Sequence, residues 1–174
     1  MIRTPFACEK GFSLLELMTV VAIVGILATM GMQSYQRFAD HARQKEAKVA
    51  LAAIYAAEKT MKAELGGYTV CLAQAGYQPP AGAQRYYTVG FWGTTVTNKN
   101  FPGSATPCTP ATDSVFNANT AANAAVTYAA QADSDATNTN FKAYAWGSIS
   151  NAVISADVWT IDETQNLVNK QPGF

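Results

Sequence analysis

The most apolar stretch of the chain lies near its N-terminus, where residues 12–32 carry a single charge, that of Glu16. In a helix that rises about 1.5 Å per residue, this length spans the roughly 30 Å hydrocarbon core of a bilayer. The pattern therefore predicts a membrane-spanning helix over residues 12–32, with the basic residues Arg3 and Lys10 on its short upstream side.

A removable secretory signal peptide is the first alternative, because it also places basic residues before an apolar run. The run here is longer than the roughly 7–15 apolar residues of such a signal. Residues 31–36, which follow it, lack a clear small-x-small cleavage site. The sequence thus favours an apolar helix that stays in the protein.

Between Tyr35 and Leu65 apolar residues recur at steps of three and four, which predicts an amphipathic continuation of the helix. The apolar positions are Phe38, Ala47, Leu51, Ile54, Ala57, Met61 and Leu65. The polar faces are expected to carry Arg43, Lys45, Glu46, Lys48, Glu58, Lys59, Lys62 and Glu64. Gly66-Gly67 is the predicted stop, so one helix of about 54 residues, on the order of 80 Å long, is expected from Phe12 to Leu65.

After Gly67 the pattern changes to short aromatic or β-branched runs bounded by turn residues, which predicts strands. The four runs are residues 85–92, 141–146, 158–161 and 166–168, and the last two are expected to form a hairpin across residues 162–165. The amphipathic half of the helix is the apolar stripe that can cover such a sheet. The expected fold class is α+β, a long N-terminal helix packed against a four-stranded antiparallel sheet. The three tryptophans, Trp92, Trp146 and Trp159, are expected to be packing residues.

The segment 94–140 is rich in Thr, Asn, Ala, Ser and Pro and carries few charges, which is typical of a surface region. Within it, residues 124–130 alternate well enough to form an additional strand. We expect most of this insertion to face outward.

The composition excludes several classes of function. The 174 residues contain 12 basic and 12 acidic side chains, so no net charge draws the chain toward nucleic acid, and the length suits one folded domain. His41 is the single histidine and has no apparent catalytic partner, so we expect no enzyme and no cofactor. Residues 133–138 begin like a calcium loop but lack its Gly and distal Glu, so no metal site is expected.

Residues 10–27, which read KGFSLLELMTVVAIVGIL, closely resemble the N-terminal signal of type IV pilins and type II secretion pseudopilins. The resemblance implies that a prepilin peptidase cuts between Gly11 and Phe12 and methylates the new amino group of Phe12. It also implies the type IV pilin fold, with residues 1–11 as a cleaved leader and residues 12–32 as a transmembrane and polymerisation helix. Residues 33–174 would form the helix continuation and the globular pilin domain.

A carboxylate within a membrane helix costs roughly 2.5–3.5 kcal/mol on insertion scales, so Glu16 requires an explanation. One explanation is that Glu16 simply lies near the membrane interface, one turn from the start of the mature chain. The resemblance implies another, in which Glu16 faces the positive amine of Phe12 in a neighbouring subunit. Such pairing would offset the desolvation of both groups and set the axial register of assembly.

The function that the resemblance implies is that of a structural subunit of a type IV pilus, which serves adhesion and surface motility. The implied partners are further copies of the chain in a helical homopolymer, the prepilin peptidase, the inner-membrane assembly machinery, and surfaces or host or prey cells. The chain would lie in the inner membrane before assembly and in an extracellular filament afterwards. The alternatives are a type II secretion pseudopilin and a membrane-anchored periplasmic binding domain that does not polymerise.

The predicted leader decides which of the three cysteines can form a disulfide in the mature protein. Cys8 is lost with the leader, whereas Cys71 and Cys108 enter an oxidising compartment together, which favours a disulfide between them. In the chain-entropy model a loop of this size contributes about 4 kcal/mol. The alternative of a metal site is weaker, because two cysteines and His41 make an incomplete ligand set.

Overall fold

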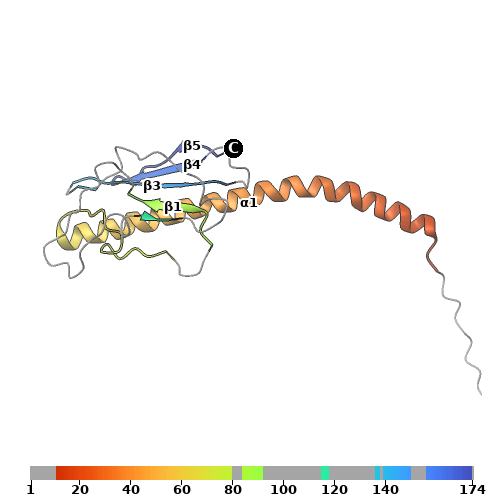
Figure 1. Cartoon of the computed structure of the whole chain (residues 1–174), viewed down its shortest axis with the longest axis horizontal. Helices are drawn as coiled ribbons and strands as arrows, with labels where there is room; N and C mark the ends of the chain where they lie inside the picture. The colour runs from red at the N-terminus through yellow and green to blue at the C-terminus, as the bar shows by residue number, and fades with distance from the viewer. Residues whose placement is uncertain are drawn as a thin grey trace, which may run out of the picture. The chain divides into compact units, whose positions relative to one another are not determined.

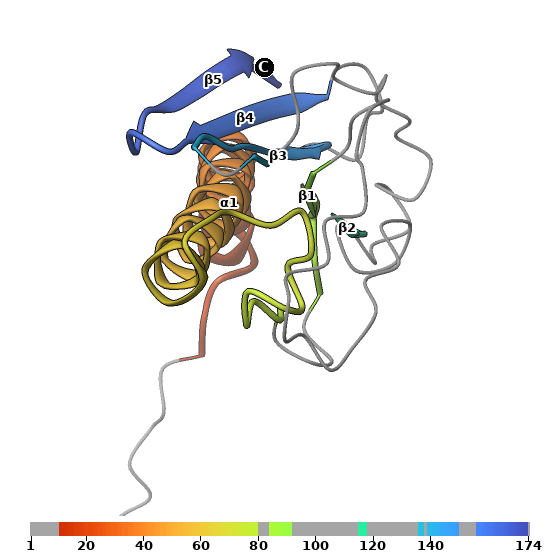
Figure 2. The ribbon, with the colours of Figure 1, turned by 90° about the vertical axis from the view of Figure 1, so that its left-hand side faces the viewer.

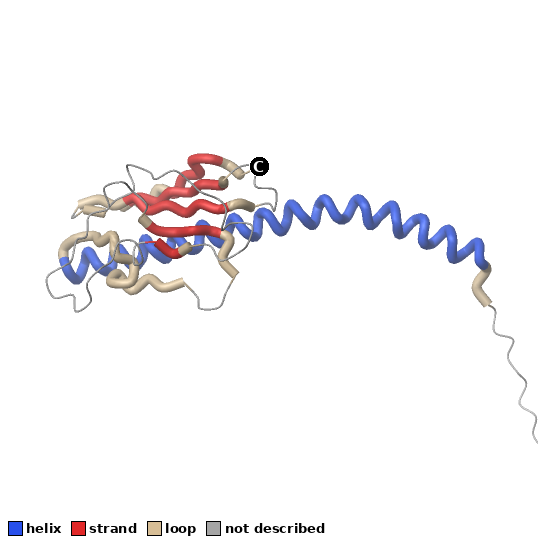
Figure 3. The backbone as a smooth tube through the Cα atoms, viewed as in Figure 1, coloured by secondary structure: helices blue, strands red, loops and turns tan. Residues whose placement is uncertain are grey.

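The computed structural model describes residues 11–79, 84–91, 115–117, 136–137, 139–149 and 156–173. Its elements, in chain order, are α1 (Leu14–Leu65), β1 (Tyr87–Gly90), β2 (Val115–Phe116), β3 (Lys142–Gly147), β4 (Asp157–Asp162) and β5 (Leu167–Gln171) (Figures 1 and 3). The α+β class expected from the sequence is confirmed. The leader residues before Gly11 lie outside the described residues, as do residues 92–114 with Cys108.

The chain divides into two compact units, residues 1–39 and residues 40–174. In the first unit, all the described side chains from Gly11 to Met32 are exposed. The helix they form is long and apolar enough to cross a membrane. Since these side chains find no burial within their own unit, the helix requires a membrane or other proteins around it.

The end of α1 follows the sequence signal. Gly66 adopts a positive φ of 81°, the left-handed conformation that glycine takes at little cost, and its N–H donates to the carbonyl of Lys62 at 2.9 Å. The predicted stop after Leu65 is confirmed.

The five strands form one antiparallel sheet in the order β2-β1-β3-β4-β5. Viewed along α1, the strands from β5 to β1 follow one another around one side of the helix (Figure 2). The predicted hairpin between the last two strands is confirmed, because β4 and β5 pair directly and Gln165 N–H donates to the Asp162 carbonyl at 3.0 Å across the turn. This sheet sits on the globular half of α1, as expected.

Strand β2 corrects the interpretation of the segment 94–140 as surface. Val115 pairs with Gly90 at the edge of the sheet and is buried, and Ala136, which forms an isolated bridge with Phe141, is fully buried. The prediction missed both because a two-residue strand and a single bridge have no detectable period; their neighbours on other strands bury them. The additional strand expected at residues 124–130 lies outside the described residues.

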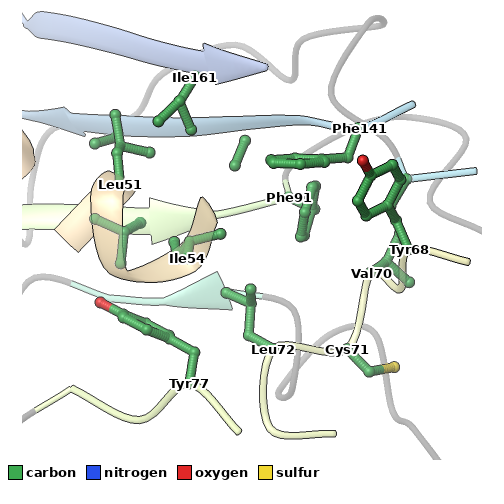
Figure 4. Close-up of a cluster of buried hydrophobic side chains, with 14 of the residues drawn as sticks. Leu51, Ile54, Tyr68, Val70, Cys71, Leu72, Tyr77, Phe91, Phe141 and Ile161 are labelled. Atoms are coloured by element: carbon green, nitrogen blue, oxygen red, sulfur yellow. The ribbon is translucent and has the colours of Figure 1, made fainter. Parts of the chain in front are cut away.

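The core between α1 and the sheet is built from helix side chains, the loop that follows the helix, and the inner face of the strands (Figure 4). Phe141 lies at its centre, with ring centroids 4.8 Å from Tyr68, 6.1 Å from Tyr55 and 6.3 Å from Phe91. A second buried cluster occupies the other face of the sheet, so this antiparallel sheet is buried on both sides. Its members are Val115, Tyr144, Trp146 and Val158.

The buried stripe of α1 differs from the predicted one at both ends and in one interior position. Ala47, Leu51, Ile54 and Met61 are buried as expected, whereas Phe38 is 75% exposed and Leu65 47% exposed. Glu58, expected on a polar face, is fully buried. Glu58 follows Ile54 by four residues, so both side chains lie on the same face of the helix. Because that face packs against the core, Glu58 is buried although its side chain is polar.

Candidate assembly site

The first described residues, Gly11, Phe12 and Ser13, precede α1 without regular structure. Phe12 is 88% exposed, and no atom lies within 4 Å of the position that a side chain on Gly11 would occupy. The peptide bond between Gly11 and Phe12 is therefore open to an approaching enzyme. Cleavage at this bond and methylation of Phe12 remain predictions.

Glu16 lies in the first turn of α1, and its Oε2 accepts a hydrogen bond from the backbone N–H of Ser13 at 2.9 Å. Ser13 and Glu16 thus stand at the N-cap and N3 positions of a capping box, in which the carboxylate satisfies an N–H that the helix itself leaves unpaired. The negative charge also complements the positive end of the helix dipole. The signal Ser-x-x-Glu was present in the sequence and the interpretation of Glu16 overlooked it.

This hydrogen bond to Ser13, the residue after Phe12, keeps the Glu16 carboxylate at the start of the helix. Thr19 and Thr29 donate their hydroxyls to the carbonyls of Glu16 and Ile26, at 2.9 and 2.8 Å. The hydroxyl groups of this apolar helix are therefore satisfied by its own backbone, as a hydrocarbon environment requires.

In the globular unit, charged residues of α1 bind the sheet rather than solvent. Both carboxylate oxygens of Glu46 accept the Tyr86 N–H, at 2.9 and 3.1 Å, and Oε1 also accepts the Tyr87 N–H at 3.3 Å. The Lys48 ammonium lies 4.3 Å from the ring centroid of Trp159. These contacts were missed because the sequence assigned Glu46 and Lys48 to polar faces, and only the strands supply their partners.

Arg43 makes a third contact of this kind. Its guanidinium lies 4.7 Å from the ring centroid of Tyr86, donates to the carbonyl of Ile149, and pairs with Asp40 at 3.2 Å. Together with Glu46 and Lys48, it attaches the globular half of α1 to β1, β4 and the β3–β4 connection. The sheet is thereby held in a defined orientation on the helix.

Cys71 is fully buried and disulfide-bonded, which agrees with an oxidising compartment for the globular unit. Its partner lies outside the described residues, so the pairing with Cys108 stays a prediction. The Cys71 N–H donates to the Thr69 hydroxyl at 3.1 Å, which orders the loop around the bond.

Nothing in the described residues assembles a reactive centre. His41 is exposed, and no group of three or more His, Cys, Asp or Glu side chains within the described residues could hold a metal ion. A pocket of about 510 Å³ lies between α1 and the residues around Tyr77, with Val49, Ala50, Ala53 and Ala57 on its helix side. Its lining offers no nucleophile paired with a base.

The comparisons with known proteins concern mainly the N-terminal part of the chain. Residues 7–32 match the prokaryotic N-terminal methylation motif. The chain is 38% identical over 81 residues to the type IV major pilin protein PilA of Myxococcus xanthus, which covers 47% of this chain and 37% of that protein.

Two further relatives match over a shorter length. The type IV major pilin protein PilE1 of Neisseria gonorrhoeae is 51% identical over 39 residues, which covers 22% of this chain and 24% of that protein. The fimbrial protein EcpC of Eikenella corrodens is 46% identical over 39 residues, covering 22% and 26%. The matched region therefore covers between about a quarter and little more than a third of the length of these relatives. The resemblance to the type IV pilin family, inferred from residues 10–27, is confirmed.

Proposed function

We propose that this chain, which carries the N-terminal methylation motif of type IV pilins, is a structural subunit that polymerises through α1 into a type IV pilus. The observation that carries the proposal is the exposed apolar half of α1, headed by Glu16. A helix with no apolar partner in its own unit needs lipid before assembly and other helices after it. We place the precursor in the inner membrane and the product in an extracellular filament.

Processing would change the charge at the helix start. Removal of residues 1–11 takes away Arg3 and Lys10 and creates a positively charged amine on Phe12, within one residue of the hydrogen bond between Ser13 and Glu16. In the isolated subunit the capping box stabilises the Glu16 carboxylate. In the filament, the Phe12 amine of a neighbouring subunit would form an ion pair with the Glu16 carboxylate. The two opposite charges would then be desolvated together.

The globular unit would form the outer part of the filament and serve adhesion and surface motility. The disulfide at Cys71 suits a domain outside the cytoplasm. Apart from its buried residues Val115 and Ala136, the segment 94–140 is rich in Thr, Ser and Asn, a composition that suits variable surface contacts. Further copies of the chain, a prepilin peptidase and the inner-membrane assembly machinery are the proposed partners.

The test begins with the mass of the N-terminal peptide from cells that express the whole chain. We expect a mature chain that starts at N-methylated Phe12; a chain that retains residues 1–11 would instead identify a membrane anchor. Electron microscopy of a strain that lacks this chain should then reveal the loss of surface filaments. Intact pili in that strain would contradict a major-pilin role and favour a minor pilin or a pseudopilin of type II secretion.

Glu16 variants test the assembly step separately from processing. We expect Glu16→Ala and Glu16→Gln both to be cleaved and methylated, because the scissile bond is unchanged. Glu16→Gln retains an oxygen that can accept the Ser13 N–H but loses the charge, so its filament yield should fall as that of Glu16→Ala does. Normal yield from Glu16→Gln would refute charge pairing and leave helix capping as the role of Glu16.

A further inference from the structure

Helix α1 buries one carboxyl group in the core of the globular unit, that of Glu58. The side chain is 0% exposed and lies on the same helix face as Ile54 and Met61. Its Oε2 accepts the backbone N–H of Thr69 at 3.0 Å, whereas its Oε1 is buried with no hydrogen-bond partner. Buried polar atoms without partners are rare in native proteins, so this carboxyl group requires a reason.

The charged neighbours of Glu58 on α1 do not neutralise it. The ammonium groups of Lys59 and Lys62 lie 3.1 and 3.4 Å from the hydroxyl of Tyr68, and no ion pair among the described residues involves Glu58. A negative charge on Glu58 would therefore be both desolvated and unpaired, which is the most costly form of a buried carboxyl group.

Among the described residues, no ion pair joins Glu58 to the other elements packed against this part of α1. The loop 66–72 contributes Tyr68 and the disulfide-bonded Cys71, which does not titrate. On the strand side, Phe141 is apolar, and the next residue, Lys142, lies opposite Asp162 of β4. Neutral Glu58 is thus the form that fits its surroundings.

The single hydrogen bond of Glu58 holds the loop 66–72 against the helix. Thr69, which donates that bond, accepts the Cys71 N–H with its hydroxyl at 3.1 Å. The neighbouring Tyr68 donates its N–H to the carbonyl of Thr137 at 3.3 Å. The carboxyl group therefore lies under the loop that carries the disulfide and joins the helix to the rest of the unit.

We propose that Glu58 is a pH-sensitive latch for the loop 66–72: the neutral carboxyl group keeps the loop closed, and loss of its proton opens the loop. Burial raises the pKa of Glu58 from 4.5 to about 8, with the Thr69 N–H lowering it in part. The closed loop therefore binds the proton more tightly than the open, solvated loop does. Raising the pH from about 4.5 to about 8 favours opening, and above pH 8 the effect is complete.

Hydrogen exchange of the Thr69 amide in the full-length chain, held in detergent micelles, tests the latch. After correction for intrinsic exchange, the protection of Thr69 should fall by up to about tenfold per pH unit between pH 4.5 and 8 and then level off. In Glu58→Gln, which is neutral at every pH, the protection of Thr69 should not depend on pH. Glu46→Gln is the matched control, because Glu46 also accepts backbone N–H groups but from Tyr86 and Tyr87, and it should keep the wild-type profile.

Infrared difference spectra of wild type against Glu58→Gln provide a second, direct readout. They should contain a protonated carboxyl band at pH 6 that disappears above pH 8. A carboxylate band at pH 6, or the same pH profile of Thr69 in wild type and Glu58→Gln, would overturn the latch. So would a Glu58→Gln chain that fails to fold, because the neutral side chain is the proposed native form.

Discussion

The hydroxyl of Tyr87 on β1 donates a hydrogen bond of 2.6 Å to Oδ2 of Asp157 on β4, across the intervening strand β3. Asp157 is fully buried, and four other donors reach its two oxygens. They are Gln44 Nε2 at 3.3 Å, Trp159 Nε1 at 2.6 Å, Asn169 Nδ2 at 3.0 Å and the Gly173 N–H at 3.1 Å. One carboxylate thus joins α1, β1, β4, β5 and the C-terminal segment, and none of these five donors is a cation. Burial, and next the bond to Asp157, raise the pKa of Tyr87, so its hydroxyl stays a donor.

Tyr87→Phe removes one of these donors and should lower the free energy of unfolding by about 1–3 kcal/mol, because a buried carboxylate loses a partner. Asp157→Asn should cost more, because one acceptor oxygen becomes an amide donor that faces other donors. Denaturant unfolding of the full-length chain in micelles measures both. Tyr86→Phe is the control, since Tyr86 is only half-buried, and its ring can keep the Arg43 contact. Equal losses in Tyr86→Phe and Tyr87→Phe would contradict the role of the Asp157 network.

Gly147 and Gly25 should respond in opposite ways to the same substitution. A methyl group on Gly147 would collide with the carbonyl of Tyr86 on the neighbouring segment, whereas a methyl group on Gly25 meets nothing within 4 Å. We expect Gly147→Ala to destabilise the globular unit by about 1–3 kcal/mol. Gly25→Ala should favour α1 by up to about 1 kcal/mol in the unassembled subunit.

Denaturant unfolding tests Gly147→Ala, and circular dichroism of the unassembled chain in micelles tests Gly25→Ala. Full stability of Gly147→Ala would mean that β1 and β3 can separate at this point without cost. If Gly25→Ala is well folded but yields few filaments, the small size of Gly25 serves close packing between the helices of different subunits.

The turn between β4 and β5 should contribute stability that is lost in acid. Burial raises the pKa of Asp162, but hydrogen bonds from Thr164 and Asn166 to its carboxylate outweigh that effect and lower it below 3.8. Because the folded-state pKa is lowered, the stabilisation is present above pH 3.8 and disappears as the pH falls through the folded-state value. Asp162→Asn can accept the same bonds but does not titrate. Between about pH 6 and pH 2 the wild type should therefore lose stability relative to Asp162→Asn. A stability difference between the two proteins that does not change with pH would refute this role of Asp162.

The disulfide prediction concerns Cys71 and Cys108. Thiol-specific labelling of the unfolded mature chain should modify neither residue before reduction and both afterwards, since the proposed cleavage would remove Cys8 with the leader. Peptide mapping should find the two in one cross-linked fragment. Cys71→Ser should lower the free energy of unfolding by about 4 kcal/mol in the chain-entropy model. Two free thiols in the mature chain would contradict the bridge.

Much of the architecture was predictable because it follows from local rules. The period of residues 35–65, the glycine pair after Leu65 and the turn residues at 162–165 each specify backbone conformation from nearby atoms alone. The predictions failed where distant segments decide the outcome. Val115 and Ala136 are buried by strands that are remote in sequence, and Glu46, Lys48 and Glu58 acquire partners only from the sheet and the loop.

The sequence by itself determined the apolar N-terminal helix. A lone Glu16 in an apolar run, preceded by Gly11 and Phe12, needs no tertiary contact to be recognised, because length and hydropathy along one helix are local properties. Tertiary structure alone decided which polar groups of the globular unit are buried and what satisfies them. Asp157 and Glu58 illustrate this difference, because both are fully buried carboxyl groups of the globular unit. Asp157 accepts hydrogen bonds from five donors and Glu58 from one. This contrast depends on how distant segments pack together, so the sequence pattern around each residue does not predict it.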